Sequence, residues 1–201
     1  MVSQKVCIFA AVMLYINDHL MDFDLAEALA QLSAQRREQA LRFKYELGQR
    51  TCAAAYLLLC QGLREEYGIT ELPFFEYGEH GKPAIVGHPE IHFNLSHCRE
   101  AALCVISDRP VGVDVESVRQ KRDGLVEYTM NAREVEEIRT AVNPDLQFIR
   151  LWTKKEALLK LTGEGINNHL KNVLDRQDVT FETVVAPDER YVYTVCRFTE
   201  N

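Results

Sequence analysis

The sequence predicts an α+β fold, because strand and helix patterns occur together in both halves of the chain. Alternating apolar and polar residues predict strands at 101–106, 111–116, 179–185 and 191–198. A segment rich in Ala, Leu, Gln, Glu and Arg predicts a long helical stretch at 34–67. With 201 residues, of which 47% are hydrophobic, the chain can form one large domain or two small lobes that share a core.

The first half is predicted to begin with a strand at 6–16, which is too short to span a bilayer. A helix at 24–33, with Asp24 as its N-cap, precedes the long helical stretch, in which Gly48 marks a candidate break. A short strand is predicted at 91–95.

In the second half, the strands at 101–106 and 111–116 are predicted to form a hairpin. Helices are predicted at 125–139 and 145–161, and a short strand at 173–175 precedes the closing hairpin.

Composition favours a cytosolic protein that neither inserts into a membrane nor binds nucleic acid in general. The six cysteines are scattered without a C-x-x-C pair, and no secretory signal pattern suggests an oxidising compartment. A net charge of -7 leaves no overall basic face for a phosphate backbone. An anionic ligand must therefore meet a local positive cluster.

The strand at 111–116 places two carboxylates on one face. Asp114 and Glu116 are two residues apart, so their side chains lie roughly 7 Å from each other on the same side. Gly112 on that face is expected to leave room beside them. Two carboxylates in this arrangement can converge on a hard cation such as Mg²⁺. The alternative is a solvent-facing strand whose acids only maintain solubility.

A helical projection of 151–161 places Thr153, Glu156 and Lys160 on one polar stripe of an otherwise mostly apolar helix. The simplest interpretation is an ion pair between residues four apart. Lys154 and Lys155 interrupt the apolar arc, so either they extend towards solvent or one of them reaches a ligand.

Other candidate residues lie in turns and at a strand end. Gly81-Lys82-Pro83 forms a turn, and no P-loop pattern surrounds it. His97 ends a strand and is able to meet a phosphate. Its neighbour Cys98 does not make a thiol protease, because adjacent strand residues point to opposite faces and no orienting third group is identifiable.

Together these segments resemble the 4'-phosphopantetheinyl transferase superfamily, in the larger form that activates surfactin synthetase. The resemblance covers the chain from Arg36 to about Gly165. It rests on five motifs in order: a basic stretch that ends at Arg50, Gly81-Lys82-Pro83, Phe93-Asn94-Leu95-Ser96-His97, Val111 to Glu116, and Trp152 to Lys160.

The resemblance implies two similar α+β lobes, at 1–107 and 108–201, with the active site between them. The implied reaction transfers the 4'-phosphopantetheine arm of coenzyme A to a serine of an apo acyl or peptidyl carrier protein and releases adenosine 3',5'-bisphosphate. By resemblance, Asp114, Glu116 and Glu156 hold Mg²⁺, for which Mn²⁺ is able to substitute. Glu156, Lys160 and His97 are the implied catalytic residues, and either Glu156 or water on the metal takes the serine proton.

The implied contacts with coenzyme A are made by Arg36, Arg50, Gly81, Lys82, Pro83, Ser96, His97, Lys155 and Lys160. Two positions depart from the family pattern. Gln39 stands where a second basic residue is frequent, which implies a thinner contact with the 3'-phosphate. Cys98 stands where serine is frequent.

By resemblance, the carrier docks between Arg119 and Met130. Arg119, Lys121 and Arg122 would supply positive charge there, and Val126, Tyr128 and Met130 apolar contacts. One two-lobed chain is compatible with a monomer. Two other functions stay open at this stage, a Mg²⁺-dependent hydrolase of nucleotide diphosphates and a non-catalytic carrier-binding module. The sequence does not name the carrier or the pathway.

Overall fold

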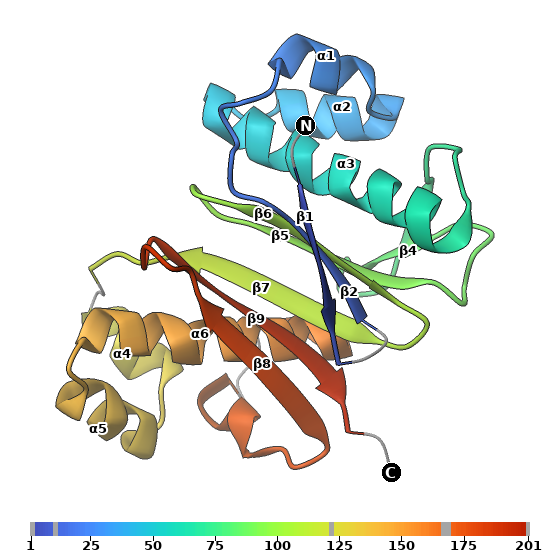
Figure 1. Cartoon of the computed structure of the whole chain (residues 1–201). Coiled ribbons are helices and arrows are strands. Elements are labelled where there is room, and N and C mark those ends of the chain that lie inside the picture. The colour runs from blue at the N-terminus through green and yellow to red at the C-terminus, as the bar shows by residue number, and fades with distance from the viewer. Residues whose placement is uncertain (1–2, 10–11, 121–122, 166–169, 200–201) are drawn as a thin grey trace.

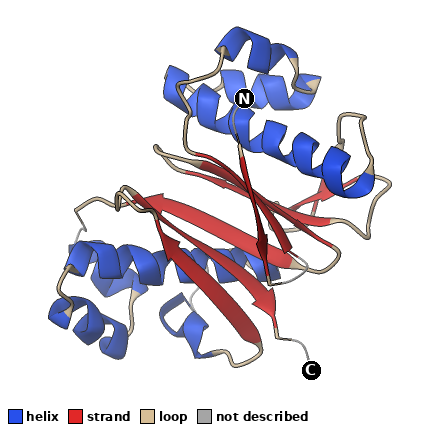
Figure 2. Cartoon of the chain, viewed as in Figure 1, coloured by secondary structure: helices blue, strands red, loops and turns tan. Residues whose placement is uncertain are grey.

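The fold combines two antiparallel sheets with helices on the outer side of each (Figures 1 and 2). A computed structural model describes residues 3–9, 12–120, 123–165 and 170–199. The α+β class predicted from the sequence is confirmed. No helix within the described ranges is both long enough and apolar enough to cross a membrane.

The first sheet is formed before residue 108 and has the strand order β1-β2-β6-β5. Its strands are β1 (Gln4–Ile8), β2 (Val12–Asn17), β6 (Ala102–Ser107) and β5 (His92–His97). The single strand predicted at 6–16 is wrong, because this run forms the two antiparallel strands β1 and β2. Phe9, directly after β1, has φ of 52°, a left-handed conformation that does not continue a strand.

The second sheet has the order β7-β9-β8. Its strands are β7 (Val111–Ser117), β9 (Tyr191–Phe198) and β8 (Val179–Val185). The predicted closing hairpin is confirmed, but the predicted pairing of 101–106 with 111–116 is wrong. β6 already has β2 on one edge and β5 on the other, so β7 pairs with β9 in a separate sheet.

One helix, α3 (Glu46–Tyr67), covers the outer face of the first sheet, and two shorter helices pack on α3 (Figure 1). The shorter helices are α1 (Leu25–Ala30) and α2 (Ala34–Leu41), and the small sheet of β3 (Phe75–Tyr77) and β4 (Pro83–Ile85) follows α3. Asp24 caps α1 as predicted by accepting a hydrogen bond of 2.8 Å from the backbone N–H of Glu27. The long helical stretch breaks before Gly48, which lies inside α3 against Phe43.

The remaining helices lie on the outer side of the second sheet (Figure 1). They are α4 (Asp123–Thr129), α5 (Ala132–Thr140), α6 (Pro144–Thr162) and the 3₁₀ helix η1 (Leu170–Asp175). The single helix predicted at 125–139 is wrong, because a capping box between Asn131 and Glu134 starts a new helix there. The predicted strand at 173–175 is also wrong, since these residues belong to η1.

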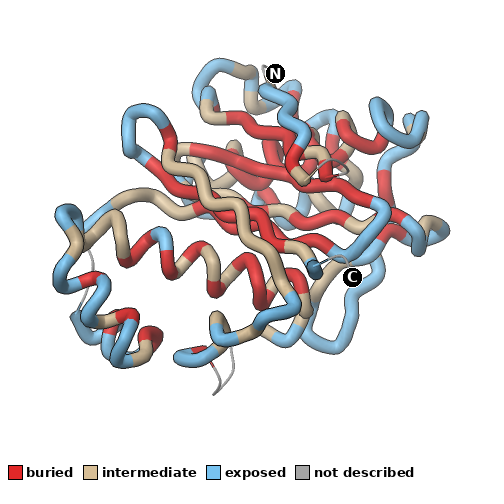
Figure 3. Tube along the Cα trace, turned by 60° about the horizontal axis from the view of Figure 1, so that its bottom comes forward, coloured by how far each residue is buried: buried red, intermediate tan, exposed pale blue. Residues whose placement is uncertain are grey.

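The strand pattern explains the layers. In β6, Leu103 and Val105 pack against the second sheet, whereas Cys104 and Ile106 pack against α3. A strand between two layers is apolar on both faces, and Figure 3 accordingly shows the central strands buried.

Gly112 lies where α6 crosses β7. A Cβ atom at this position would be 2.1 Å from the carbonyl oxygen of Ala157 and 2.6 Å from the backbone nitrogen of Leu161. The expectation that Gly112 leaves room beside the carboxylates is therefore wrong, because the helix backbone fills that space. The close approach brings Glu156 and Lys160 of α6 to the polar face of β7.

We expect Gly112→Ala to reduce the free energy of unfolding by roughly 3 kcal/mol or more, because neither backbone segment can move away easily. Gly124→Ala in α4 is the matched control, since a Cβ atom there meets no atom of the described residues within 4 Å. That change should be neutral or stabilising, as alanine favours helices. Urea unfolding of both variants checks the pair, and equal stability would contradict the close approach of α6.

Candidate active site

The centre of the site is the buried carboxylate of Asp114, which is 4% exposed. Its Oδ1 accepts hydrogen bonds from Lys160 Nζ at 2.6 Å and from Ser96 Oγ at 2.9 Å. Its Oδ2 is buried and has no hydrogen-bond partner among the described residues. One oxygen is thus held by protein groups, while the other keeps its capacity to bind a ligand.

Glu116 and Glu156 lie near Asp114. Burial raises the pKa of Glu156 to about 7, and the charges of Asp114 and Glu116 add to the increase. Burial and the charge of Asp114 also raise the pKa of Glu116. The charge of Asp114 thus contributes to the raised pKa of both glutamates, and a bound cation would relieve this repulsion.

The donor set fits Mg²⁺. Carboxylate oxygens are the ligands that Mg²⁺ prefers, and Asp114 Oδ2 is an unpaired buried oxygen. However, no group of three or more His, Cys, Asp or Glu side chains within the described ranges is already arranged to hold a metal. Asp114, Glu116 and Glu156 are thus near one another without forming a finished ligand set.

His97 adds a neutral donor or acceptor to this centre. Burial lowers the pKa of His97 to about 4, and the charges of Arg36 and Lys160 lower it further. The ring lies edge-on to Phe43, with 6.2 Å between ring centroids. His97 therefore lies near two positive charges, and we call the surroundings of His97, Arg36 and Lys160 the anion-favouring region.

A pocket of about 270 Å³ joins the Gly81-Lys82-Pro83 turn to α6. Glu156 and Lys160 line it together with the turn. Lys82 Nζ donates a hydrogen bond of 2.7 Å to the carbonyl oxygen of Leu161 at the end of α6. Burial lowers the pKa of Lys82. The residue thus bonds the end of α6 and also lines the pocket.

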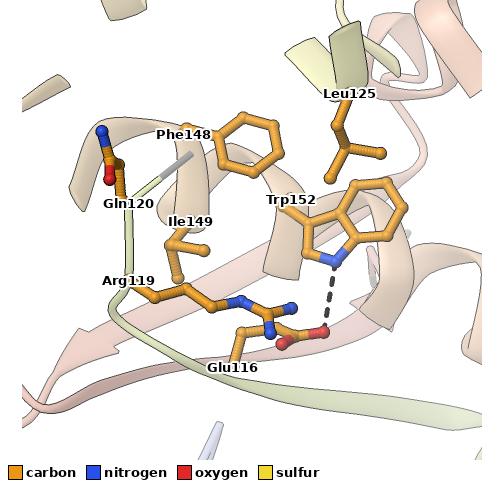
Figure 4. Close-up of a pocket in the computed structure, with 7 residues that line it drawn as sticks. All are labelled: Glu116, Arg119, Gln120, Leu125, Phe148, Ile149 and Trp152. Carbon is orange, nitrogen blue, oxygen red and sulfur yellow. Dashed lines mark hydrogen bonds between the residues drawn. The ribbon is translucent and has the colours of Figure 1, made fainter. Parts of the chain in front are cut away.

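A second pocket, of about 320 Å³, is lined by Glu116. Figure 4 shows the rings of Phe148 and Trp152 and the side chain of Leu125 around it, with the guanidinium of Arg119 near Glu116. Trp152 Nε1 donates a hydrogen bond of 3.2 Å to Glu116 Oε1. Glu116 lines this pocket, which we call the apolar pocket for Leu125, Phe148, Ile149 and Trp152, whereas Glu156 lines the pocket at the glycine-rich turn.

The two arginines expected at the 3'-phosphate differ in their surroundings. Arg36 donates to Gln39 Oε1 at 2.9 Å and lies close enough to influence His97. Arg50 pairs with Glu46 at 2.8 Å and donates to the carbonyl oxygen of Phe23 at 2.7 Å. Arg36 therefore belongs to the anion-favouring region, while Arg50 also ties the loop before α1 to α3.

The hydroxyl of Ser96, an expected phosphate contact, is bonded to other parts of the site. Its hydroxyl donates to Asp114 and accepts from Val115 N at 3.2 Å and from Lys160 Nζ at 3.0 Å. A hydroxyl has one donor and two acceptor positions, so these three bonds use all of them. Ser96 is an internal residue of the site.

The ammonium of Lys155, an expected contact of coenzyme A, is likewise bonded within the protein. Its side chain is wholly buried, and Nζ forms a 2.9 Å ion pair with Glu134. The same ammonium donates to the carbonyl oxygens of Leu170 and Lys171, each at 2.9 Å. Lys155 fixes α5 and η1 to the back of α6, away from Asp114.

The expected docking segment is only partly exposed. Val126 and Met130 are 7% and 1% exposed, so the apolar contacts expected of them are wrong. Tyr128 is 69% exposed and Arg119 lines the apolar pocket. Lys121 and Arg122 lie outside the described residues.

For three residues that bond elements of this region together, the sequence predicted no role. Asn94 accepts a hydrogen bond from the backbone N–H of Val113, Glu134 pairs with Lys155, and Trp152 donates to Glu116. Signals existed for two of them. Asn94 and Ser96 are polar residues two apart in an apolar strand, and the N-x-x-E pattern at 131–134 is typical of a capping box.

Comparisons with known proteins find relatives in one superfamily. The family model described as the 4'-phosphopantetheinyl transferase superfamily matches residues 110–196, which include Asp114, Glu116 and Glu156. The chain is 31% identical to 4'-phosphopantetheinyl transferase psf-1 of Bacillus pumilus over 148 residues, which are 72% of this chain and 64% of that protein. The chain belongs to the 4'-phosphopantetheinyl transferase superfamily.

Two further members of the superfamily extend the comparison. A 4'-phosphopantetheinyl transferase of Bacillus subtilis is 26% identical over 186 residues, which are 84% of this chain and 83% of that protein. The transferase HetI of Nostoc sp. is 33% identical over 151 residues, which are 71% of this chain and 64% of that protein. The chain thus spans just under two thirds of the psf-1 and HetI transferases.

In this member of the superfamily, we expect Lys155→Met to reduce the free energy of unfolding by roughly 3–5 kcal/mol, because Glu134 would stay buried without its cation. Adding Glu134→Gln should recover much of the loss. Lys154→Met, at the half-buried neighbouring position, is the matched control and should cost far less. Urea unfolding checks the set. A stable Lys155→Met variant with weakened coenzyme A binding would instead indicate that Lys155 contacts coenzyme A.

The low pKa of His97 predicts a pH effect on stability. Unfolded histidine takes up a proton near pH 6.5, whereas folded His97 does so only near pH 4. The unfolded state therefore binds more protons between these values, and stability falls as pH falls through this window. At pH 5 the loss should be roughly 2 kcal/mol larger than in His97→Gln. Denaturation of both proteins at pH 7.5 and pH 5 checks this, and parallel losses would contradict the burial of the ring.

Proposed function

We propose that the chain transfers the 4'-phosphopantetheine arm of coenzyme A to a serine of an apo acyl or peptidyl carrier protein. The serine oxygen forms a bond to the phosphorus that carries the pantetheine. The bond from that phosphorus to the bridging oxygen breaks, and adenosine 3',5'-bisphosphate leaves. The serine proton passes to a base in the site.

One observation carries the proposal. Glu116 lines one pocket, Glu156 and Lys160 line the other, and the same helix, α6, lines both pockets. Asp114 is bonded to Lys160 and acts on the pKa of both glutamates. Phosphoryl chemistry depends mainly on positioning and on stabilising negative charge, which this arrangement offers. The names of the superfamily relatives agree with this reaction.

Asp114, Glu116 and Glu156 would hold Mg²⁺, which supplies positive charge to the diphosphate and to the leaving oxygen when bound. Lys160 holds one oxygen of Asp114, and its positively charged side chain lines the pocket at the Gly81-Lys82-Pro83 turn. His97, neutral near physiological pH because of its low pKa, is able to donate a hydrogen bond to a phosphate oxygen.

The two pockets suit the two ends of coenzyme A. We assign the nucleotide to the pocket of Gly81, Lys82 and Pro83, with Arg36 and Arg50 on the side of the 3'-phosphate. The pantetheine arm is uncharged and partly apolar, so the pocket of Leu125, Phe148 and Trp152 suits it. Glu116 would then lie where the arm meets the diphosphate (Figure 4).

We further assign carrier docking to the segment from Arg119 to Met130, where the exposed ring of Tyr128 is the described apolar contact. Arg119 would attract an acidic carrier to a chain of net charge -7. Two lobes, at 1–107 and 108–201, together complete one site, so a single chain is sufficient as a monomer. Six free thiols agree with the reducing cytosol.

Intact mass spectrometry of an apo carrier protein tests the proposed reaction. Incubation with the chain, coenzyme A and Mg²⁺ should increase the carrier mass by one phosphopantetheine group and produce adenosine 3',5'-bisphosphate. A carrier whose serine is replaced by alanine is the control. Cleavage of coenzyme A without carrier modification would instead indicate a hydrolase.

We expect Glu156→Gln to lower kcat by about 10²-fold or more, because it removes a metal ligand and a candidate base. The melting temperature in metal-free buffer should not fall, since one of three mutually repelling carboxyl groups is neutralised. If Glu156 made only a helical ion pair with Lys160, stability would fall slightly and the rate would hardly change. Measuring both quantities on this variant distinguishes the two roles.

We expect Leu125→Trp to fill the apolar pocket and raise the KM for coenzyme A by about tenfold, a change of about 1.4 kcal/mol in binding. The affinity of this variant for adenosine 3',5'-bisphosphate, which lacks the pantetheine arm, should stay within twofold of the wild type. Calorimetric titration with both ligands checks this. Equal weakening of both would place the arm elsewhere.

A further inference from the structure

The two sheets meet along β5 and β7, and side chains make the contact there. β5 is the outer strand of the first sheet and β7 is the outer strand of the second. The outer edge of a strand leaves every second backbone N–H without a partner in the sheet. A buried N–H without a partner is costly, so this edge needs acceptors from elsewhere.

Both acceptors come from β5. The N–H of Val113 donates to Asn94 Oδ1 at 3.1 Å, and the N–H of Val115 donates to Ser96 Oγ at 3.2 Å. Asn94 and Ser96 are each 6% exposed. The two donors and the two acceptors are both two residues apart, which is the repeat of a strand.

Asp114 lies between the two bonded N–H groups of β7. Ser96 reaches it as well, donating to Asp114 Oδ1 while accepting from Val115. Lys160 binds both Ser96 and Asp114. A shift of β7 along β5 would break these bonds together.

We propose that Asn94 and Ser96 are positioning residues that replace backbone hydrogen bonds between β5 and β7 and thereby fix Asp114 relative to Lys160 and His97. The catalytic consequence rests on the proposed transfer reaction, whereas the bonding itself does not. Packing of Val113 and Val115 in the core between the sheets also holds β7, but packing does not specify which N–H group finds an acceptor.

Amide hydrogen exchange of the ligand-free chain, followed by NMR, tests the bonding. Val105 in β6, fully buried and paired on both sides, is the reference for global unfolding. Relative to Val105, Asn94→Ala should accelerate exchange at Val113 by about tenfold and leave Val115 less affected. Ser96→Ala should do the reverse.

Two matched variants control for general destabilisation. Asn94→Asp keeps the acceptor oxygen, so Val113 should stay protected. Thr183→Val removes the hydrogen bond of 2.9 Å between the hydroxyls of Thr183 and Thr194 in the same sheet as β7. This change should leave both exchange ratios unchanged. If Asn94→Ala does not fold, Ser96→Ala decides alone, because Val113 then serves as its internal reference.

The kinetic readout is a fall of about tenfold in kcat for Asn94→Ala and Ser96→Ala. The KM for coenzyme A should stay within twofold of the wild type in Ser96→Ala, whereas Asn94 also lines the pocket assigned to the nucleotide. Unchanged exchange ratios in both alanine variants would overturn the proposal. So would accelerated exchange with wild-type kcat, since the bonds would then position nothing. Failure of the wild type to modify a carrier would count against the proposed function and not against the bonding.

Discussion

The ion pair between Lys160 and Asp114 determines where the other parts of the site lie. Charged groups taken out of water are costly unless they are paired and hydrogen-bonded, and here the pair has a distance of 2.6 Å with Ser96 bonded to both partners. Three elements therefore meet at one carboxylate: α6 through Lys160, β7 through Asp114 and β5 through Ser96. Gly112 permits the meeting, because only a residue without a side chain lets α6 come so near β7.

The sequence predicted the local structure well where one physical cause dominated. Asp24 caps α1 as the pattern predicted, and α6 ends within one residue of its predicted end at 161, where Gly163 takes a left-handed conformation. Pairing between strands was harder, because alternation shows which face is buried and not which edge is occupied. β6 and β7 look like a hairpin, yet both edges of β6 are taken. Phe9 likewise gave no sign of its left-handed backbone.

The site residues were likewise predicted only in part. Spacing on β7 and on α6 indicated which carboxylates share a face, and the structure brings Asp114, Glu116 and Glu156 into one electrostatic neighbourhood. Lys155 and Ser96 took other roles because their partners are remote in sequence. Lys155 meets a capping glutamate from α5, and Ser96 meets an edge N–H of β7. A motif describes which residues occur together and not which partner each one satisfies.

Asp114 has one oxygen held by Ser96 and Lys160 and a second without a partner among the described residues, which we propose as the metal ligand. Titration of the chain with Mn²⁺ in the presence of coenzyme A, followed by electron paramagnetic resonance, tests this most directly. We predict one tight site in the wild type and its loss in Asp114→Asn, with coenzyme A still bound to the variant. Equal Mn²⁺ affinity in the two proteins would contradict the account.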